Sequence, residues 1–192
     1  FEDEKSIVGS KGEDPVNLLL DRCLDGIKVM DLLPMDKLYL IMKLREISYG
    51  DDYDTVLICD HCKAENPTKV KLSSLNVNPV PDDFVDPITV FLPTVKREAK
   101  VRLPRVRDEK TLSDTTTSLN QIWRFVQEID GHSDKSIVAA VVDKLPLVDI
   151  KTILKAFETD YGLDTKVKLE CKDCGGVSVL ELPINSNFFG VS

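Results

Sequence analysis

The chain has 192 residues, 42% of them hydrophobic and 30% charged, which is enough for a globular protein with a buried core. Its net charge of -8 disfavours a protein that mainly coats nucleic acid, because phosphate binding depends on Lys and Arg. Apolar runs stay far below the roughly 18 residues of a membrane span, and the first residues lack the order of a secretory signal, so we expect a soluble protein with protein partners.

The first part of the chain predicts two helices followed by a β-hairpin. Asp14 is a good N-cap for a helix over 15–27, because a Pro follows it at the first helical position. A second helix is predicted over 34–48, and strands over 55–58 and 68–75 form the hairpin. The helical spacing of apolar residues predicts a buried face on the first helix, made of Val16, Leu19, Leu20, Cys23, Leu24 and Ile27.

The later part of the chain begins after a segment with three prolines, 76–87, which is the best candidate for a boundary. Alternating apolar residues predict a second hairpin with strands at 88–92 and 100–103. Three helices are then expected, at 113–129 around the single tryptophan, at 133–144 with Ser133 as its cap, and at 146–161. Two final strands are predicted, at 165–171 and 177–183.

Two CxxC motifs are the strongest chemical signal, and they belong to a longer repeat. A shift of 112 positions superposes residues 37–62 on 149–174 without a gap, and nine of these 26 pairs are identical. The identical pairs trace a helix, its glycine stop, a strand and a CxxC knuckle. We therefore predict an internally duplicated α+β protein, with a first repeat at 1–78 and a second at 79–192 that pack as one compact unit. The identical pairs are Ile41/Ile153, Lys43/Lys155, Glu46/Glu158, Tyr49/Tyr161, Gly50/Gly162, Asp52/Asp164, Leu57/Leu169, Cys59/Cys171 and Cys62/Cys174.

The two CxxC pairs suit a structural zinc site. Four thiolates supply the tetrahedral shell that zinc prefers, and they leave no position for a catalytic water. The predicted ligands of this zinc-ribbon-like site are Cys59, Cys62, Cys171 and Cys174. Disulfides, or four reduced thiols without a metal, are the alternatives. Cys23, the odd cysteine, is interpreted as a small buried hydrophobe, and His61 as a solvated residue of the first knuckle.

A cluster of basic residues stands out in this acidic chain. Most such runs are solvated faces, but this one could also dock an acidic partner or, less favourably, nucleic acid. Bases usually stack on aromatic side chains, and none is interleaved here. The cluster comprises Lys96, Arg97, Lys100, Arg102, Arg105, Arg107 and Lys110.

The sequence contains none of the common enzyme signatures, such as HExxH, the phosphate-binding GxxxxGK[ST] loop, GxSxG or GxGxxG. Only two histidines, His61 and His132, are available for acid-base chemistry, and we interpret His132 as a loop residue without a special role. We therefore predict no catalytic residues, no cofactor-binding residues beyond the metal ligands, and no enzymatic activity.

With these features laid out, the chain resembles the baseplate hub assembly proteins of T-even-like contractile-tailed phages, the family that includes the product of T-even gene twenty-six. The resemblance covers most of the chain. The matching stretches are Phe1 to Lys5, residues 38–50, the motif Cys59-x-x-Cys62-x-x-x-Asn66, residues 167–174, Leu182, and the closing Phe188 and Phe189. In that family β-strands precede the Phe1 stretch, which implies a further N-terminal segment.

The resemblance implies a viral structural or assembly protein that helps to form the baseplate hub around the central spike and tail tube. Its expected partners are other baseplate hub, tail-tube or tape-measure proteins, with assembly in the host cytoplasm. The resemblance leaves open whether the protein stays in the virion tail or leaves as a chaperone. The alternative is a nucleic-acid-associated zinc-ribbon regulator that uses the basic residues between Lys96 and Lys110.

Overall fold

A computed structural model describes residues 14–113, 120–184 and 188, and its helices and strands make an α+β protein. The predicted features at Phe1 to Lys5 and at Phe189 lie outside these residues, as do positions 114–119 of one predicted helix. Among the described residues, each helix is too short or too polar to cross a bilayer. The chain divides into two compact units, and each unit takes two separate stretches of sequence.

The first unit contains the described residues up to Lys37 together with Val80–Asp160, and the second contains Leu38–Pro79 with those from Tyr161 onward. The repeats predicted at 1–78 and 79–192 are defined by sequence similarity and not by compactness. The division into two repeats therefore stays a prediction, and it is separate from the division into two compact units.

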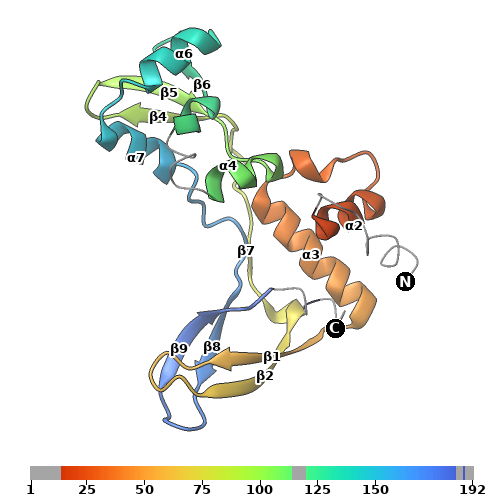
Figure 1. Cartoon of the computed structure of the whole chain (residues 1–192). Helices are drawn as coiled ribbons and strands as arrows, with labels where there is room; N and C mark the ends of the chain where they lie inside the picture. The colour runs from red at the N-terminus through yellow and green to blue at the C-terminus, as the bar shows by residue number, and fades with distance from the viewer. Residues whose placement is uncertain (1–13, 114–119, 185–187, 189–192) are drawn as a thin grey trace. The chain divides into compact units, whose positions relative to one another are not determined.

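A three-stranded antiparallel sheet in the order β4-β5-β6 is the centre of the first unit (Figure 1). Its strands are β4 (Ile88–Leu92), β5 (Arg97–Val101) and β6 (Val126–Ile129). The helices α6 (Lys135–Val142) and α7 (Leu147–Lys155) pack their apolar sides against its buried face. Strand alternation explains the core, because Val90 and Leu92 point inward while Thr89 and Phe91 point outward. The buried core comprises Val90, Leu92, Ala99, Val101, Ile122, Phe125, Val126, Ile129, Val138, Val142, Ile150 and Ile153.

The buried carboxylate of Asp149 ties the tip of this sheet to α7. It lies in the first turn of the helix, is fully buried, and accepts the backbone N–H groups of Thr94 at 2.9 Å and Val95 at 3.2 Å. A charge without water around it is stable only when hydrogen bonds replace its solvation. The turn between β4 and β5 is thus held by a side chain more than 50 residues away.

The remaining elements of the first unit are short. They are α2 (Pro15–Cys23), η1 (Val29–Asp31), the start of α3 (Pro34–Tyr49), η3 (Val106–Asp108), α4 (Glu109–Ser113) and η4 (Ile122–Arg124). Asp14 caps α2 as predicted, by accepting the N–H of Val16 at 3.0 Å. The buried Lys37 binds both Asp14 and Glu109, at 3.3 and 3.2 Å.

The second unit contains two β-hairpins and a short strand pair. The hairpins are β1 (Asp52–Ile58) with β2 (Glu65–Lys71), and β8 (Lys166–Glu170) with β9 (Val177–Glu181). The short pair is β3 (Val77–Asn78) with β7 (Gly162–Leu163), and η2 (Leu72–Ser74) follows β2. Inward residues of the two hairpins form one small core that contains Leu57, Cys59, Leu169 and Cys171.

The predicted helix at 113–129 is wrong over its second half. Residues 122–124 form a single 3-10 turn, and Val126–Ile129 is strand β6, paired with β5. Phe125, Val126 and Ile129 are all buried in the core of the three-stranded sheet. Pairing with strand β5, whose partner residues lie 25–30 positions earlier in the sequence, outweighs the local helical spacing.

The predicted burial of Cys23 is also wrong. The helix ends at Cys23 and the chain is extended at Leu24, so the apolar face is interrupted there. Cys23 is exposed, as is Ile27 at 53%. Two smaller corrections concern the later helices: Asp134, not Ser133, caps α6, and α7 ends at Lys155.

Candidate metal centre

The four cysteines of the two CxxC motifs meet in the second unit. Their sulfur atoms all lie within 4.8 Å of one another, a grouping that could hold a metal ion. Two of these separations join different hairpins: Cys59 Sγ lies 3.7 Å from Cys174 Sγ, and Cys62 Sγ lies 3.6 Å from Cys171 Sγ. The fold therefore brings together two motifs that are separated by 108 residues in the sequence.

The arrangement suits a tetrahedral ion of the size of zinc. Sulfurs bound to zinc at about 2.3 Å stand about 3.8 Å apart along each tetrahedral edge. The two sulfur separations given above are close to this edge length. All four cysteines are free thiols in this structure, which therefore has no disulfide among them.

Backbone geometry around both motifs follows the same plan at the same 112-residue shift. In the first turn, the N–H of Cys59 donates to Ala64 O at 3.0 Å, and the N–H of Lys63 donates to Cys59 O at 2.9 Å. In the second turn, the N–H of Cys171 donates to Gly176 O and the N–H of Gly175 donates to Cys171 O, both at 2.9 Å. Lys63 and Gly175 both have a positive φ, of 61° and 68°. Each turn thus buries its first cysteine and exposes its second, which leaves one side of the sulfur cluster open to solvent.

The register of the two hairpins repeats as well. Ile58 faces Glu65 in the first hairpin, as Glu170 faces Val177 in the second. Upstream, Gly50 and Gly162 have φ values of 92° and 94°, a region that only glycine enters readily.

Hydrogen bonding and burial shift the thiol pKa values in opposite directions. Donation from the backbone N–H of Cys174 lowers the pKa of Cys171 to about 6; burial opposes this, and the Asp173 N–H and the Asn66 amide add to it. At Cys62 the N–H of Ala64 lowers the pKa, but hydrogen bonds with the other thiols and burial outweigh it and raise the pKa to about 12. Four thiolates this close repel each other, so full deprotonation requires a cation among them.

Two residues outside the cysteine pattern complete the site. Asn66 is buried and reaches from β2 to the second turn, while His61 lies over Gly176 and its Nε2 is 3.3 Å from Val177 O. His61 is exposed, as expected, but it contacts the opposite turn. The sequence signal for Asn66 was its place in the motif that follows the first CxxC, whereas no pattern indicated the contact of His61 with Gly176.

The predicted basic cluster is largely neutralised within the first unit. Arg102 makes two hydrogen bonds to Asp108, at 2.7 and 3.1 Å, and Lys100 pairs with Glu128 at 2.9 Å. Three further pairs are Arg97 with Asp130, Arg105 with Asp86, and Arg107 with Asp31. Five of the seven basic residues therefore have an acidic partner, which weakens the case for phosphate binding.

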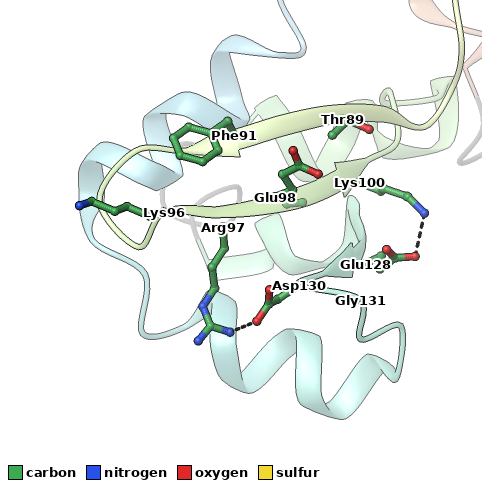
Figure 2. Close-up of a pocket in the computed structure, with 10 residues that line it drawn as sticks. Thr89, Phe91, Lys96, Arg97, Glu98, Lys100, Glu128, Asp130 and Gly131 are labelled. Carbon is green, nitrogen blue, oxygen red and sulfur yellow. Dashed lines mark hydrogen bonds and ion pairs between the residues drawn. The ribbon is translucent and has the colours of Figure 1, made fainter.

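A shallow hollow on the outer face of the three-stranded sheet includes part of this cluster. Figure 2 shows the Arg97–Asp130 and Lys100–Glu128 pairs along it, with Phe91 at its other side. Phe91 is 57% exposed. The three basic and three acidic side chains that line the hollow balance, so it offers no net charge to a ligand.

A protein-family model described as "T4 bacteriophage base plate protein" matches residues 2–190, nearly the whole chain. No curated protein matches the sequence. No solved structure matches it either.

Proposed function

Because the chain belongs to the T4 bacteriophage base plate protein family, we propose that it is a structural and assembly protein of the baseplate hub, stabilised by a structural zinc ion. The observation that carries this proposal is the family match over residues 2–190, which agrees with the resemblance seen in the sequence. A structural baseplate role places the protein in the phage tail. Hub membership, zinc and a role without catalysis are the finer parts of the proposal.

The proposed partners are other hub, tail-tube or tape-measure proteins, which this chain meets in the host cytoplasm during assembly. The test is a density map of the assembled tail together with co-purification from infected cells. We expect the chain to co-purify with hub or tape-measure proteins. Retention on tail-sheath components alone, with no hub protein present, would contradict the hub assignment.

The proposed zinc ligands are Cys59, Cys62, Cys171 and Cys174. Support comes from four free thiols close enough to share one ion, two of whose separations match a tetrahedral edge. Four thiolates would fill the shell of the ion and leave no position for a catalytic water. Zinc would join the two hairpins and add free energy of folding, because the unfolded chain has no preformed site. Elemental analysis of reduced protein is expected to give one zinc per chain; Cys171→Ser should lose it and Cys23→Ser should keep it. Reduced wild-type protein without metal would refute the zinc assignment.

Internal duplication is the proposed origin of this site. It is supported by the nine identical pairs and by the hydrogen bonds, strand register and glycine φ values that recur at the 112-residue shift. The nucleic-acid regulator is the weaker candidate, because acidic partners neutralise most of the basic cluster. Salt-dependent retention on DNA would favour it, and we expect no retention at physiological salt.

A further inference from the structure

Asn66 connects the first hairpin to the second CxxC turn. It points inward from β2, opposite Leu57, and only 2% of its surface is exposed. Its Nδ2 donates toward Cys171 Sγ at 3.5 Å, and its Oδ1 accepts the backbone N–H of Lys172 at 3.0 Å. One side chain therefore holds both a sulfur and the backbone next to it.

The orientation of this amide is determined by its surroundings. Nδ2 uses its second hydrogen to bind Ala64 O at 3.0 Å, and Oδ1 faces the N–H of Lys172. A reversed amide would place two donors against each other and lose all three bonds. The donor is thus directed at the sulfur of Cys171.

The corresponding position of the second hairpin lacks such a connection. Ser178 faces Leu169 as Asn66 faces Leu57, and it follows Asn66 at the 112-residue shift. Its Oγ is buried without a hydrogen-bond partner among the described residues. A hairpin of this type therefore packs with a residue at this position that makes no side-chain hydrogen bond. Hairpin packing alone does not require the contacts of Asn66.

We propose that Asn66 is a positioning residue of the metal centre, which acts through Cys171 and has no direct contact with the ion. Its N–H takes up part of the charge of the Cys171 thiolate and fixes the direction of that sulfur, while the bond from Lys172 holds the turn in place. This inference rests on the proposed zinc site. Partners of this kind commonly change metal affinity by about 10-fold to 100-fold when they are removed.

Asn66→Asp in the full chain is the sharpest test. Asp has nearly the same shape and keeps an acceptor for Lys172, but it places an oxygen where the donor to Cys171 lies. Competition with a chromophoric chelator is expected to show zinc affinity weaker by about 10-fold to 100-fold. The matched control is Ser178→Ala, which should stay within about threefold of wild type because it removes a hydroxyl without a partner.

Spectroscopy separates positioning from general loss of structure. In the cobalt-loaded protein, loss of the donor to Cys171 should move the sulfur-to-cobalt charge-transfer band to longer wavelength, whereas Ser178→Ala should leave it in place. In wild-type protein loaded with cadmium-113, an Asn66 side-chain proton should show scalar coupling to the metal through the sulfur, a readout that needs no variant to fold. Wild-type affinity and an unshifted band in Asn66→Asp, or no such coupling in wild type, would overturn the role of Asn66 alone. Failure of the wild-type chain to bind any of these metals would overturn the zinc site as well.

Discussion

Replacement of Gly176 by Ala tests how the two CxxC turns fit together. A Cβ at this position would lie 2.6 Å from His61 Cδ2 and 3.2 Å from Cys174 Sγ, well inside the 3.5–4.0 Å of ordinary carbon contacts. Unlike Gly175, Gly176 does not have a left-handed backbone, so the added methyl group is opposed by contacts and not by φ.

The expected cost follows from what must move. The His61 ring has to turn away and give up its hydrogen bond to Val177 O, a net loss of about 0.5–1.5 kcal/mol, and crowding of the Cys174 sulfur adds to it. The lower entropy of an unfolded Ala returns about 0.4–1 kcal/mol. We therefore expect Gly176→Ala to destabilise the second unit by about 1–2 kcal/mol.

The assay is a double-mutant cycle with His61→Ala, measured by amide hydrogen exchange in β8 and β9 with excess zinc. Removal of the ring should reduce the cost of Gly176→Ala by about 1 kcal/mol or more. The matched control is Ala64→Gly, at the corresponding position of the first turn, which should cost about 0.4–1 kcal/mol regardless of His61. An equal cost of Gly176→Ala with and without the ring would refute this explanation.

Three further predictions concern the first unit, for which the fluorescence of its single tryptophan in urea reports the free energy of unfolding. Asp149→Asn should cost about 1–3 kcal/mol, because an amide group would face one of two backbone donors, whereas the exposed Asp143→Asn should stay within about 0.5 kcal/mol. Asp134→Ala should cost about 1 kcal/mol through the lost helix cap, and Ser133→Ala should change stability little; equal effects would contradict the assignment of the cap. Burial raises the pKa of Asp108, but bonds from an arginine and a backbone N–H outweigh it and lower that pKa, so its contribution is present above the ordinary carboxyl pKa and lost as pH falls through the folded value. Asp108→Asn should therefore weaken the acid dependence of unfolding, and an unchanged pH profile would count against this role.

The sequence predicted best where local pattern and tertiary structure agree. The helix expected at 34–48 is α3, Pro34–Tyr49, and the strand expected at 88–92 is β4 with the same ends. Both have sharp local signals: a proline starts the helix, and the strand is a short run rich in β-branched and aromatic residues. The meeting of the four cysteines also followed from sequence, because each motif is half of a known type of metal shell.

Prediction failed where a distant partner decides the structure. Strand β6 exists because β5 offers backbone groups and buried neighbours, and nothing near Trp123 in the sequence indicates this. The same holds for Asp149, whose carboxylate caps a turn 54 residues earlier. Asn66 was visible in the sequence, but its role depends on a turn that lies 106 residues away.

The interleaved order of the two units affects how the second is completed during synthesis. Its first two thiols, Cys59 and Cys62, emerge from the ribosome about 110 residues before Cys171, which at about 5–20 residues per second is a delay of roughly 5–20 s. Throughout this interval the first hairpin is present with its two cysteines, but the cluster still lacks the two sulfurs of the second hairpin. A translation product that stops before Cys171 therefore cannot close the cluster, because two of the four sulfurs are then absent.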